Sequence, residues 1–198
     1  MCNSIKQIIE YQYNMKKITL KKPIKVDCVV GIDPDVEKSG CAYLEVATRK
    51  LEISTLTFPD LLDFLRHIKR QSEVTQKNVR VIIEAGWLNK AHWHLLPKDT
   101  KQSAAAKGNA AGRNHEVGRK IAEMCEHWQI PYELIKPLAL KVGGVNLWQG
   151  KDGKITQEEL SAFTGIMGRT NQEGRDAALI AWEWSGLPVK VVRKSTKK

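Results

Sequence analysis

The sequence predicts an α/β fold in which one five-stranded mixed sheet, with three antiparallel strands and two parallel ones, is covered by helices on both faces. Two observations predict this class. Three strand-like runs follow one another before any helix, and after them helical and strand-like runs alternate. The chain has 198 residues, of which 42% are hydrophobic, so we expect a single domain with one core over residues 25–187.

Three antiparallel strands are expected first. Residues 25–33, KVDCVVGID, form a β-branched run that stops at Asp33, as a buried central strand would. Residues 39–47 and 50–58 are two further strand-like runs, and the short turn between them predicts an antiparallel meander.

Helices and the remaining strands alternate after residue 58. Residues 59–70 begin with Pro and Asp and carry apolar residues at helical spacing, which predicts an amphipathic helix. A fourth strand, NVRVIIEAG, has its last apolar run stopped by Glu84. A helix over residues 114–129 and a fifth strand over residues 132–137 follow.

Two helices are expected near the end of the chain. Residues 156–165 predict a short helix, with Thr156 as its N-cap and Glu159 as the capping-box partner. Residues 171–185 carry the last apolar helical run.

The charge balance indicates a polyanionic partner. Lys and Arg outnumber Asp and Glu by 32 to 22, which gives a net charge of +10 and a pI near 9.5. Basic residues also mark an N-terminal arm over residues 1–24 and a C-terminal tail over residues 188–198. Nucleic acid is the expected partner, and the alternative is an ordinary solvated basic surface.

Cysteine usage and hydropathy indicate the compartment. The four cysteines form no C-x-x-C pair, and Cys28 and Cys41 fall in strand-like runs, which fits a reducing environment. No run of about 18 apolar residues is present, and the N-terminus lacks a signal-peptide pattern. We therefore expect a cytoplasmic protein without a membrane partner.

Four carboxylates fall at the edges of apolar elements. Asp33 ends the first strand and Glu84 the fourth, while Glu173 and Asp176 are three residues apart on one face of the last helix. If the first and fourth strands are parallel neighbours, all four carboxylates converge. The alternative is that each acid is an ordinary turn or cap residue.

Such a cluster is unfavourable without cations, because like charges a few ångströms apart raise each other's pKa. Hard oxygen ligands select Mg²⁺ or Mn²⁺ over zinc. Two such ions, about 4 Å apart, would support in-line hydrolysis of a phosphodiester.

Four runs of the sequence, in this order and spacing, together resemble RuvC-type Holliday-junction resolvases of the ribonuclease H-like superfamily. The resemblance covers about residues 26–186. It rests on VVGIDPDVEKSGCAYLE, VIIEAGW, HEVGRKIAEMCEHWQIPYELIKPLALK and EGRDAALIAW. It implies a ribonuclease H-like sheet and a metal-dependent endonuclease.

The resemblance also implies roles for individual residues. The metal ligands of the family match Asp33, Glu84, Glu173 and Asp176. Where this chain has Glu173 the family often has Asp, so that ligand reaches one methylene further. The base-stacking aromatic of the family matches Trp87, for which an ordinary core role is the alternative.

Two lysines near the scissile phosphate are implied as well. Lys141 matches the first of them, and either Lys151 or Lys154 matches the second. The stretch from Lys90 to Lys120 departs from the family because it is longer than the usual connection. We expect it to follow phosphates, with a disordered solvated loop as the alternative. The basic residues assigned to nucleic-acid binding are Lys90, Lys107, Arg113, Arg119 and Lys120.

The function that the sequence favours is a structure-selective DNA endonuclease that resolves four-way junctions with two Mg²⁺ or Mn²⁺ ions per site. Two alternatives remain: another ribonuclease H-like nuclease acting on RNA/DNA hybrids or flaps, and a non-catalytic nucleic-acid-binding module. Because a junction has two symmetric strands to cut, the resemblance also implies a homodimer.

Overall fold

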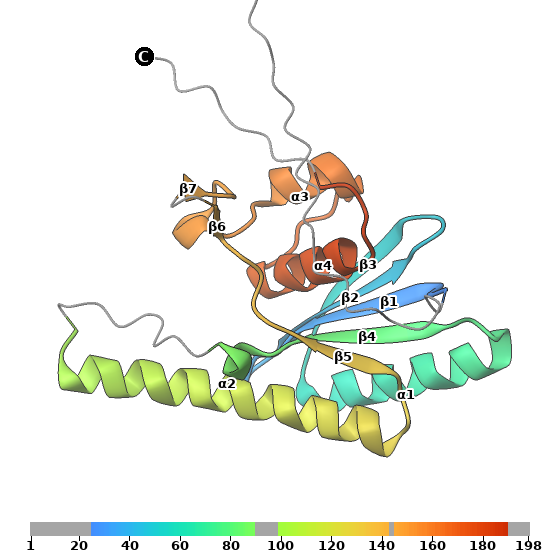
Figure 1. Cartoon of the computed structure of the whole chain (residues 1–198), viewed down its shortest axis with the longest axis horizontal. Helices are drawn as coiled ribbons and strands as arrows, with labels where there is room; N and C mark the ends of the chain where they lie inside the picture. Colours follow the sequence, from blue (N-terminus) through green and yellow to red (C-terminus); the bar gives the residue numbers. More distant parts are fainter. Residues whose placement is uncertain (1–24, 90–98, 143–144, 190–198) are drawn as a thin grey trace, which may run out of the picture.

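A computed structural model of the chain describes residues 25–89, 99–142 and 145–189. Its centre is a five-stranded mixed sheet in the order β3-β2-β1-β4-β5 (Figure 1). The strands are β1 (Cys28–Asp33), β2 (Ser39–Glu45), β3 (Lys50–Leu56), β4 (Val79–Glu84) and β5 (Tyr132–Ile135). The predicted fold class is confirmed.

Strand β1 lies in the middle of the sheet and is where the antiparallel and parallel halves meet. It pairs antiparallel with β2, which in turn pairs antiparallel with β3. On its other side β1 pairs parallel with β4, and β4 pairs parallel with β5. Five of the six residues of β1 are buried, as its β-branched run predicted.

Helices cover both faces of the sheet, as predicted. The helices are α1 (Phe58–Thr75), α2 (Lys101–His127), α3 (Gln157–Thr164) and α4 (Gln172–Trp184). In Figure 1, α1 and α2 lie on one face and α4 on the other, with α3 beyond α4. Short elements complete the described chain: two 3₁₀ turns, η1 (Gly86–Leu88) and η2 (Lys151–Gly153), and a small hairpin of β6 (Lys141–Val142) and β7 (Val145–Asn146).

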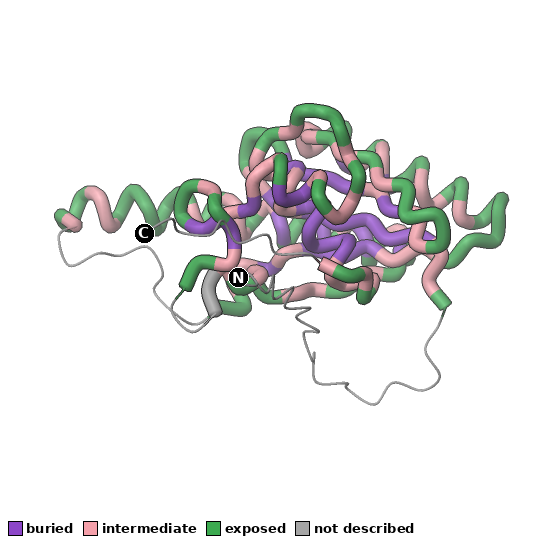
Figure 2. The backbone as a smooth tube through the Cα atoms, turned by 90° about the horizontal axis from the view of Figure 1, so that it is seen from above, coloured by how far each residue is buried: buried purple, intermediate pink, exposed green. Residues whose placement is uncertain are grey.

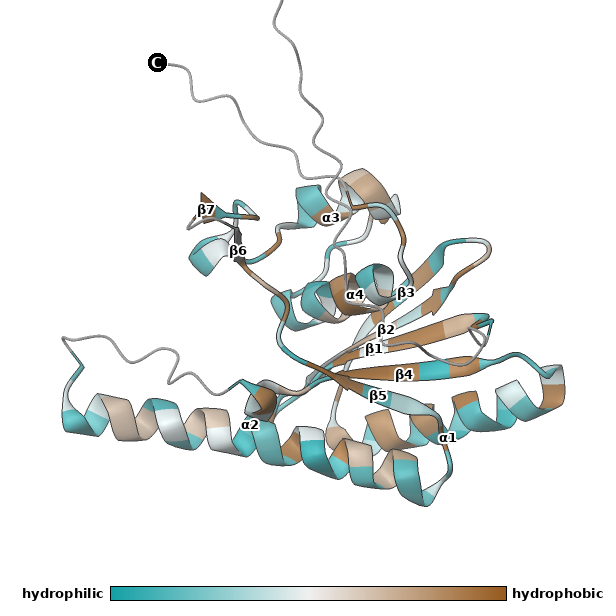
Figure 3. Ribbon diagram, viewed as in Figure 1, coloured by the Kyte–Doolittle hydropathy of each residue, from teal (hydrophilic) through white to brown (hydrophobic). Residues whose placement is uncertain are grey.

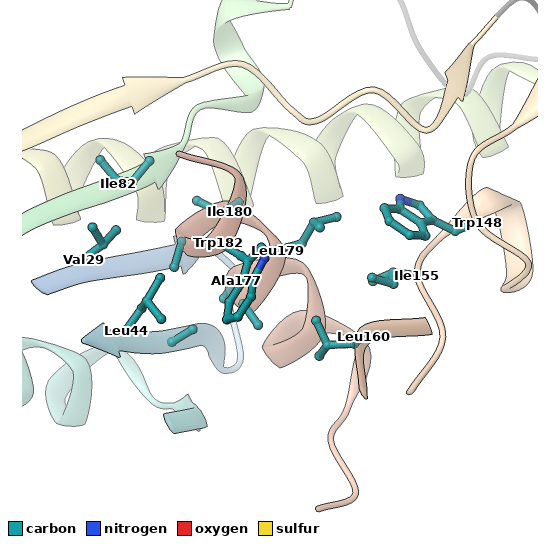
Figure 4. Packing of buried hydrophobic residues seen from close by; sticks show 13 residues of the cluster. Val29, Leu44, Ile82, Trp148, Ile155, Leu160, Ala177, Leu179, Ile180 and Trp182 are labelled. Atoms are coloured by element: carbon teal, nitrogen blue, oxygen red, sulfur yellow. The ribbon is translucent and has the colours of Figure 1, made fainter. Parts of the chain in front are cut away.

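The alternation of side chains along the strands divides the core into two layers. On the α4 side, Val29, Leu44 and Ile82 pack against Ala177 and Trp182, as Figure 4 shows. On the other side, the intervening strand residues pack against α1 and α2. Figure 2 shows the buried residues concentrated between the layers, and Figure 3 shows β1 and β4 hydrophobic along most of their length.

Helix α2 is longer than the sequence analysis predicted. It begins at Lys101, so residues 101–113, which we expected to be an irregular phosphate-following segment or a disordered loop, form its first half. The physical reason is the run of alanines in this segment, which have the highest helix propensity, together with Thr100, whose side chain caps Ser103 N–H. The weak amphipathicity of this half hid the helix from a search for apolar spacing.

The other predicted helices are confirmed with small shifts of their ends. Helix α1 extends to Thr75, beyond the predicted end at residue 70. The capping box of Thr156 and Glu159 is present at the start of α3. Cys28, Cys41 and Cys125 are buried free thiols. The basic arm over residues 1–24, and the basic tail from residue 190 on, lie outside the described residues.

Within the described part of the chain, no helix combines the length and the apolar character that crossing a bilayer requires.

Candidate active site

The pairing of the strands brings Asp33 and Glu84 to the same edge of the sheet. Because β1 and β4 are parallel and Ile32 faces Ile83 in register, the next residue of each strand lies at the carboxyl edge. The strand β1 ends there because Pro34 follows it and has no N–H to continue the ladder. The parallel arrangement on which the predicted convergence depended is therefore present.

Helix α4 brings Asp176 to this edge, and its position is fixed at its N-terminus. The side chain of Asn171 caps the helix by accepting a hydrogen bond from Gly174 N–H at 3.0 Å, and Thr55 Oγ1 of β3 lies 3.0 Å from the same Asn171 oxygen. Gly40 of β2 allows the close approach of the helix, because a Cβ there would collide with the Glu173 carbonyl. The last helix thus packs directly on the sheet beside Asp33.

Asp33, Glu84 and Asp176 line one cavity of about 110 Å³, which also contains Lys154. This volume is enough for several water molecules. The remainder of the lining is apolar and consists of Pro137, Leu138, Leu140, Trp148, Ile155 and Leu179. Three separated segments of the chain therefore present carboxylates to a single, partly open cavity whose other lining residues, apart from Lys154, are apolar.

Lys154 lies among these acids as an ammonium group. Its Nζ is 2.8 Å from Asp176 Oδ2, and the side chain of Asp176 is only 17% exposed. Burial by itself would lower the pKa of Lys154, but the facing carboxylates of Asp176, Asp33 and Glu84 outweigh burial and raise the pKa. Lys154 is therefore charged at neutral pH.

Two acids of the cavity, Asp33 and Glu84, have raised pKa values. Burial is the largest cause for Asp33, whose pKa is raised well above its usual value, and the neighbouring Glu84 and Asp176 raise it further. Burial and then Asp176 raise the pKa of Glu84 to about 7, against the opposing effects of Lys154 and a hydrogen bond from the Leu138 backbone. Burial in the cavity therefore favours the protonated forms of Asp33 and Glu84.

The chemistry of this site fits a hard divalent cation. The side chains that converge offer carboxylate oxygens, and one cation, the Lys154 ammonium, already lies against Asp176. Even so, within residues 25–89, 99–142 and 145–189 no three His, Cys, Asp or Glu side chains form a ready-made metal-binding group. The three acids share the cavity with Lys154, which is paired with Asp176.

The structure places the other predicted site residues differently. Glu173 does not line the cavity, although it is close enough to raise the pKa of Asp33 slightly. Of the two lysines that the sequence left open, Lys154 lies in the cavity and Lys151 is exposed in η2. Lys141 belongs to β6, and its side chain lies outside what the structure describes.

Trp87 lies in η1, immediately after β4, and is half-buried against α2. Its ring contacts His115 edge-on at a centroid distance of 6.2 Å, and the Arg119 guanidinium lies 5.2 Å from the ring centroid. A Cβ on Gly118 would come within 2.6 Å of the indole, so the helix and ring pack closely. Trp87 therefore packs against α2, and its role in base stacking stays a prediction.

The basic residues assigned to nucleic-acid binding are mostly on α2. Lys107 Nζ is 2.8 Å from Asp99 and Lys120 Nζ is 2.7 Å from Glu123, so both are in ion pairs. Arg113 is exposed on the half of α2 that extends past the sheet in Figure 1. Lys90 lies outside the described residues.

Sequence reasoning missed two residues next to the acids. Gln172 Nε2 donates to Asp176 Oδ1 at 2.8 Å, and Arg175 Nη2 donates to Gln172 Oε1 at 2.8 Å. A signal for Gln172 was present, because it stands four residues before Asp176 and so shares its helix face. The lining residue Trp148 gave no such signal, since nothing local indicates which buried aromatic will line the same cavity as the acids.

Comparison with known proteins gives a structural likeness only. No family model matches the sequence, and no curated protein matches it. Among solved structures, Thermus thermophilus RuvC in complex with a Holliday junction substrate is 14% identical with a TM-score of 0.37, covering 82% of this chain and 98% of that chain. Another Thermus thermophilus RuvC structure is 15% identical with a TM-score of 0.38, covering 82% and 99%.

Proposed function

We propose that this chain is a divalent-metal-dependent DNA endonuclease that cuts branched DNA, with four-way junctions as its substrate. The single observation that carries the proposal is the cavity in which Asp33, Glu84 and Asp176, from three different elements, meet beside Lys154. The choice of junctions over other nucleic acids rests on the sequence motifs that resemble RuvC-type resolvases. The net charge of +10 supports a polyanionic substrate.

In this proposal the three cavity acids would hold two Mg²⁺ or Mn²⁺ ions, and Glu173, which lies outside the cavity lining at the start of α4, would be the fourth ligand. Bound ions would activate a water molecule and stabilise the leaving oxygen of the phosphodiester. The apolar residues of the cavity have a different role. The apolar lining residues Trp148, Ile155 and Leu179 would lower the local polarity and so strengthen electrostatic interactions in the cavity.

Lys154 has a separate role in the proposal. Its ammonium is charged, it is 42% exposed, and it is within hydrogen-bond distance of Asp176. Such an ammonium would donate to a non-bridging oxygen of the scissile phosphate. Because the pKa values of Asp33 and Glu84 are raised, binding of a cation by these acids would release protons.

The central test compares the Asp33→Asn variant with a matched control, Asp35→Asn. Asp35 accepts a hydrogen bond from Glu37 N–H at 2.9 Å and one from Asn114 at 3.0 Å, and it does not line the cavity. We expect Asp33→Asn to reduce Mg²⁺-dependent nicking of a synthetic junction by more than about 100-fold, the upper end for residues that only support a metal ligand. Junction binding should survive, and Asp35→Asn should cut nearly as fast as the parent.

Equal cutting rates for Asp33→Asn and the parent would reject the proposed role of this site. The same assay with junction, flap and RNA/DNA hybrid substrates side by side distinguishes a junction enzyme from another nuclease. If the parent protein binds DNA in a salt-sensitive manner but cuts none of them with Mg²⁺ or Mn²⁺, the chain is a binding module.

Junction resolution also requires two cuts on symmetric strands, so we propose that two copies of the chain act together. Sedimentation velocity of the protein alone and with a junction would detect the dimer. A monomer in both samples would contradict paired cutting by this chain.

A further inference from the structure

Gln172 and Asp176 are connected within the first turns of α4. The side-chain amide of Gln172 donates from Nε2 to Asp176 Oδ1 at 2.8 Å, and the same nitrogen lies 3.4 Å from the Ile155 carbonyl. Gln172 is half-buried and is the first residue of the helix, one turn before Asp176. One of the two oxygens of Asp176 is therefore already engaged by a residue of its own helix.

Arg175 decides which way the Gln172 amide faces. Its Nη2 donates to Gln172 Oε1 at 2.8 Å, so the oxygen of the amide points to Arg175 and the NH₂ group must point to Asp176. The guanidinium is itself held, because Nη1 donates to the Thr170 carbonyl at 2.5 Å and Nε to the Ile155 carbonyl at 3.1 Å. The planar fork of Arg makes this a fixed brace rather than a mobile contact.

The other oxygen of Asp176 contacts Lys154, which also lines the cavity. Lys154 Nζ lies 2.8 Å from Oδ2, while Gln172 takes Oδ1. Arg175 and Gln172 both contact the carbonyl of Ile155, the residue after Lys154. The same brace thus fixes the carboxylate of Asp176 and the backbone that presents the lysine.

We propose that Gln172 is a positioning residue that holds Asp176 with Oδ2 directed into the cavity as the ion-binding oxygen, and that Arg175 fixes the amide in the required orientation. This inference rests on the proposed function, since it assigns Asp176 as a metal ligand. An outer-shell hydrogen bond of this kind orients a ligand and lowers the entropy lost on binding the ion.

The test changes Gln172 to Met, which keeps the length of the side chain and removes the amide. Gln157→Met is the matched control, because Gln157 also makes several hydrogen bonds, to Thr170 and Ser161, but none to Asp176. Binding of Mn²⁺ to the DNA-free full chain is measured by electron paramagnetic resonance. The Mg²⁺ concentration for half-maximal junction cleavage and the rate at saturating Mg²⁺ are measured separately.

We expect Gln172→Met to bind Mn²⁺ about 10-fold more weakly than both the parent and Gln157→Met. The Mg²⁺ midpoint should rise by a similar factor, while the rate at saturating Mg²⁺ stays within about threefold of the parent, since the amide does not touch the substrate. If the Met variant does not fold, Gln172→Asn retains a polar residue at the helix start but is too short to reach Oδ1. The same loss is expected for it.

Equal Mn²⁺ affinity in Gln172→Met and Gln157→Met would overturn the positioning role while leaving the proposed nuclease intact. A loss of saturated rate without a change in Mn²⁺ affinity would also overturn it. Absence of Mn²⁺ binding in the parent protein would instead reject the metal site itself, and the positioning role with it.

Discussion

At the scale of single residues, burial raises the pKa values of several carboxyl groups. Asp33 and Glu84 are at the cavity, where burial and neighbouring carboxylates raise their pKa values, and cations can offset the cost. Glu183, in the last turn of α4, is a different case. Burial alone raises its pKa to about 7, and no charged neighbour contributes. Its effect on stability should therefore follow pH rather than metal concentration.

The pH dependence of Glu183 has a definite sign. The folded state holds the carboxyl proton up to pH about 7, whereas the unfolded chain loses it near 4.5. The stability of the parent should therefore fall between these two values and level off above them. The Glu183→Gln variant cannot titrate at this position. Relative to this variant, we expect the free energy of unfolding of the parent to fall by on the order of 2 kcal/mol between pH about 4.5 and pH about 8.

Urea unfolding of both proteins across this pH range measures the difference. Asp33 and Glu84 titrate in both proteins, so their contributions cancel in the comparison. Stability curves that run parallel with pH would show that Glu183 is not held in its neutral form.

At the scale of elements, helix α2 consists of two halves with different support. Its second half packs on the sheet through Ile121 and Cys125, which are fully buried. Its first half extends past the sheet, and Cβ atoms added at Gly108 and Gly112 would meet nothing within 4 Å. Figure 2 shows this half mostly exposed. Intrinsic helix propensity and the Thr100 cap, rather than packing, must therefore hold the first half.

Three glycine-to-alanine changes test this division. Gly108→Ala and Gly112→Ala should each stabilise the first half by roughly 0.5–1 kcal/mol, because Ala has the higher helix propensity and there is room for its methyl group. Gly118→Ala should instead destabilise the protein by about 1–3 kcal/mol, since its Cβ would lie 2.6 Å from the Trp87 ring.

Amide hydrogen exchange over residues 101–113 and urea unfolding measure the two effects. The exchange rates should slow in the first two variants, and the unfolding midpoint should drop only in the third. If neither Gly108→Ala nor Gly112→Ala changes the exchange rates over residues 101–113, helix propensity does not stabilise this half of α2.

At the scale of the whole molecule, the two faces of the mixed sheet and its carboxyl edge have different roles. The apolar layers on either face stabilise the fold, and the carboxyl edge of β1 and β4 collects the acids. The long α2 carries additional cations beyond the sheet. The net charge of +10 belongs to the chain as a whole, whereas the cavity gathers three acids, so the proposed function would place the attraction of DNA and the binding of cations at different parts of the molecule.

This arrangement predicts a strong salt dependence of DNA binding. With Asp33→Asn, which should bind without cutting, the association constant for a junction should fall at least about tenfold between 50 mM and 200 mM salt, as about two or more phosphate contacts would require. Fluorescence anisotropy over that range gives the slope. An affinity that does not change with salt would contradict a phosphate-binding surface.

The sequence by itself determined the class of the fold and three of the acids. Short β-branched and apolar runs located the strands, and a carboxylate that stops an apolar strand is visible without coordinates, as at Asp33 and Glu84. The helical spacing of the last apolar run likewise indicated Asp176. These signals are local, since each depends on residues within one turn or one strand.

Only the tertiary structure decided the rest, because it depends on which distant segments meet. It placed Lys154 rather than Lys151 among the acids and directed the Gln172 amide to Asp176 through Arg175. It also packed Trp87 against Gly118 and left Glu173 outside the cavity lining. Contacts between segments that are distant in the sequence set the directions of these side chains. The periodicity of the sequence shows which face of an element is buried but does not show which distant side chains will meet there.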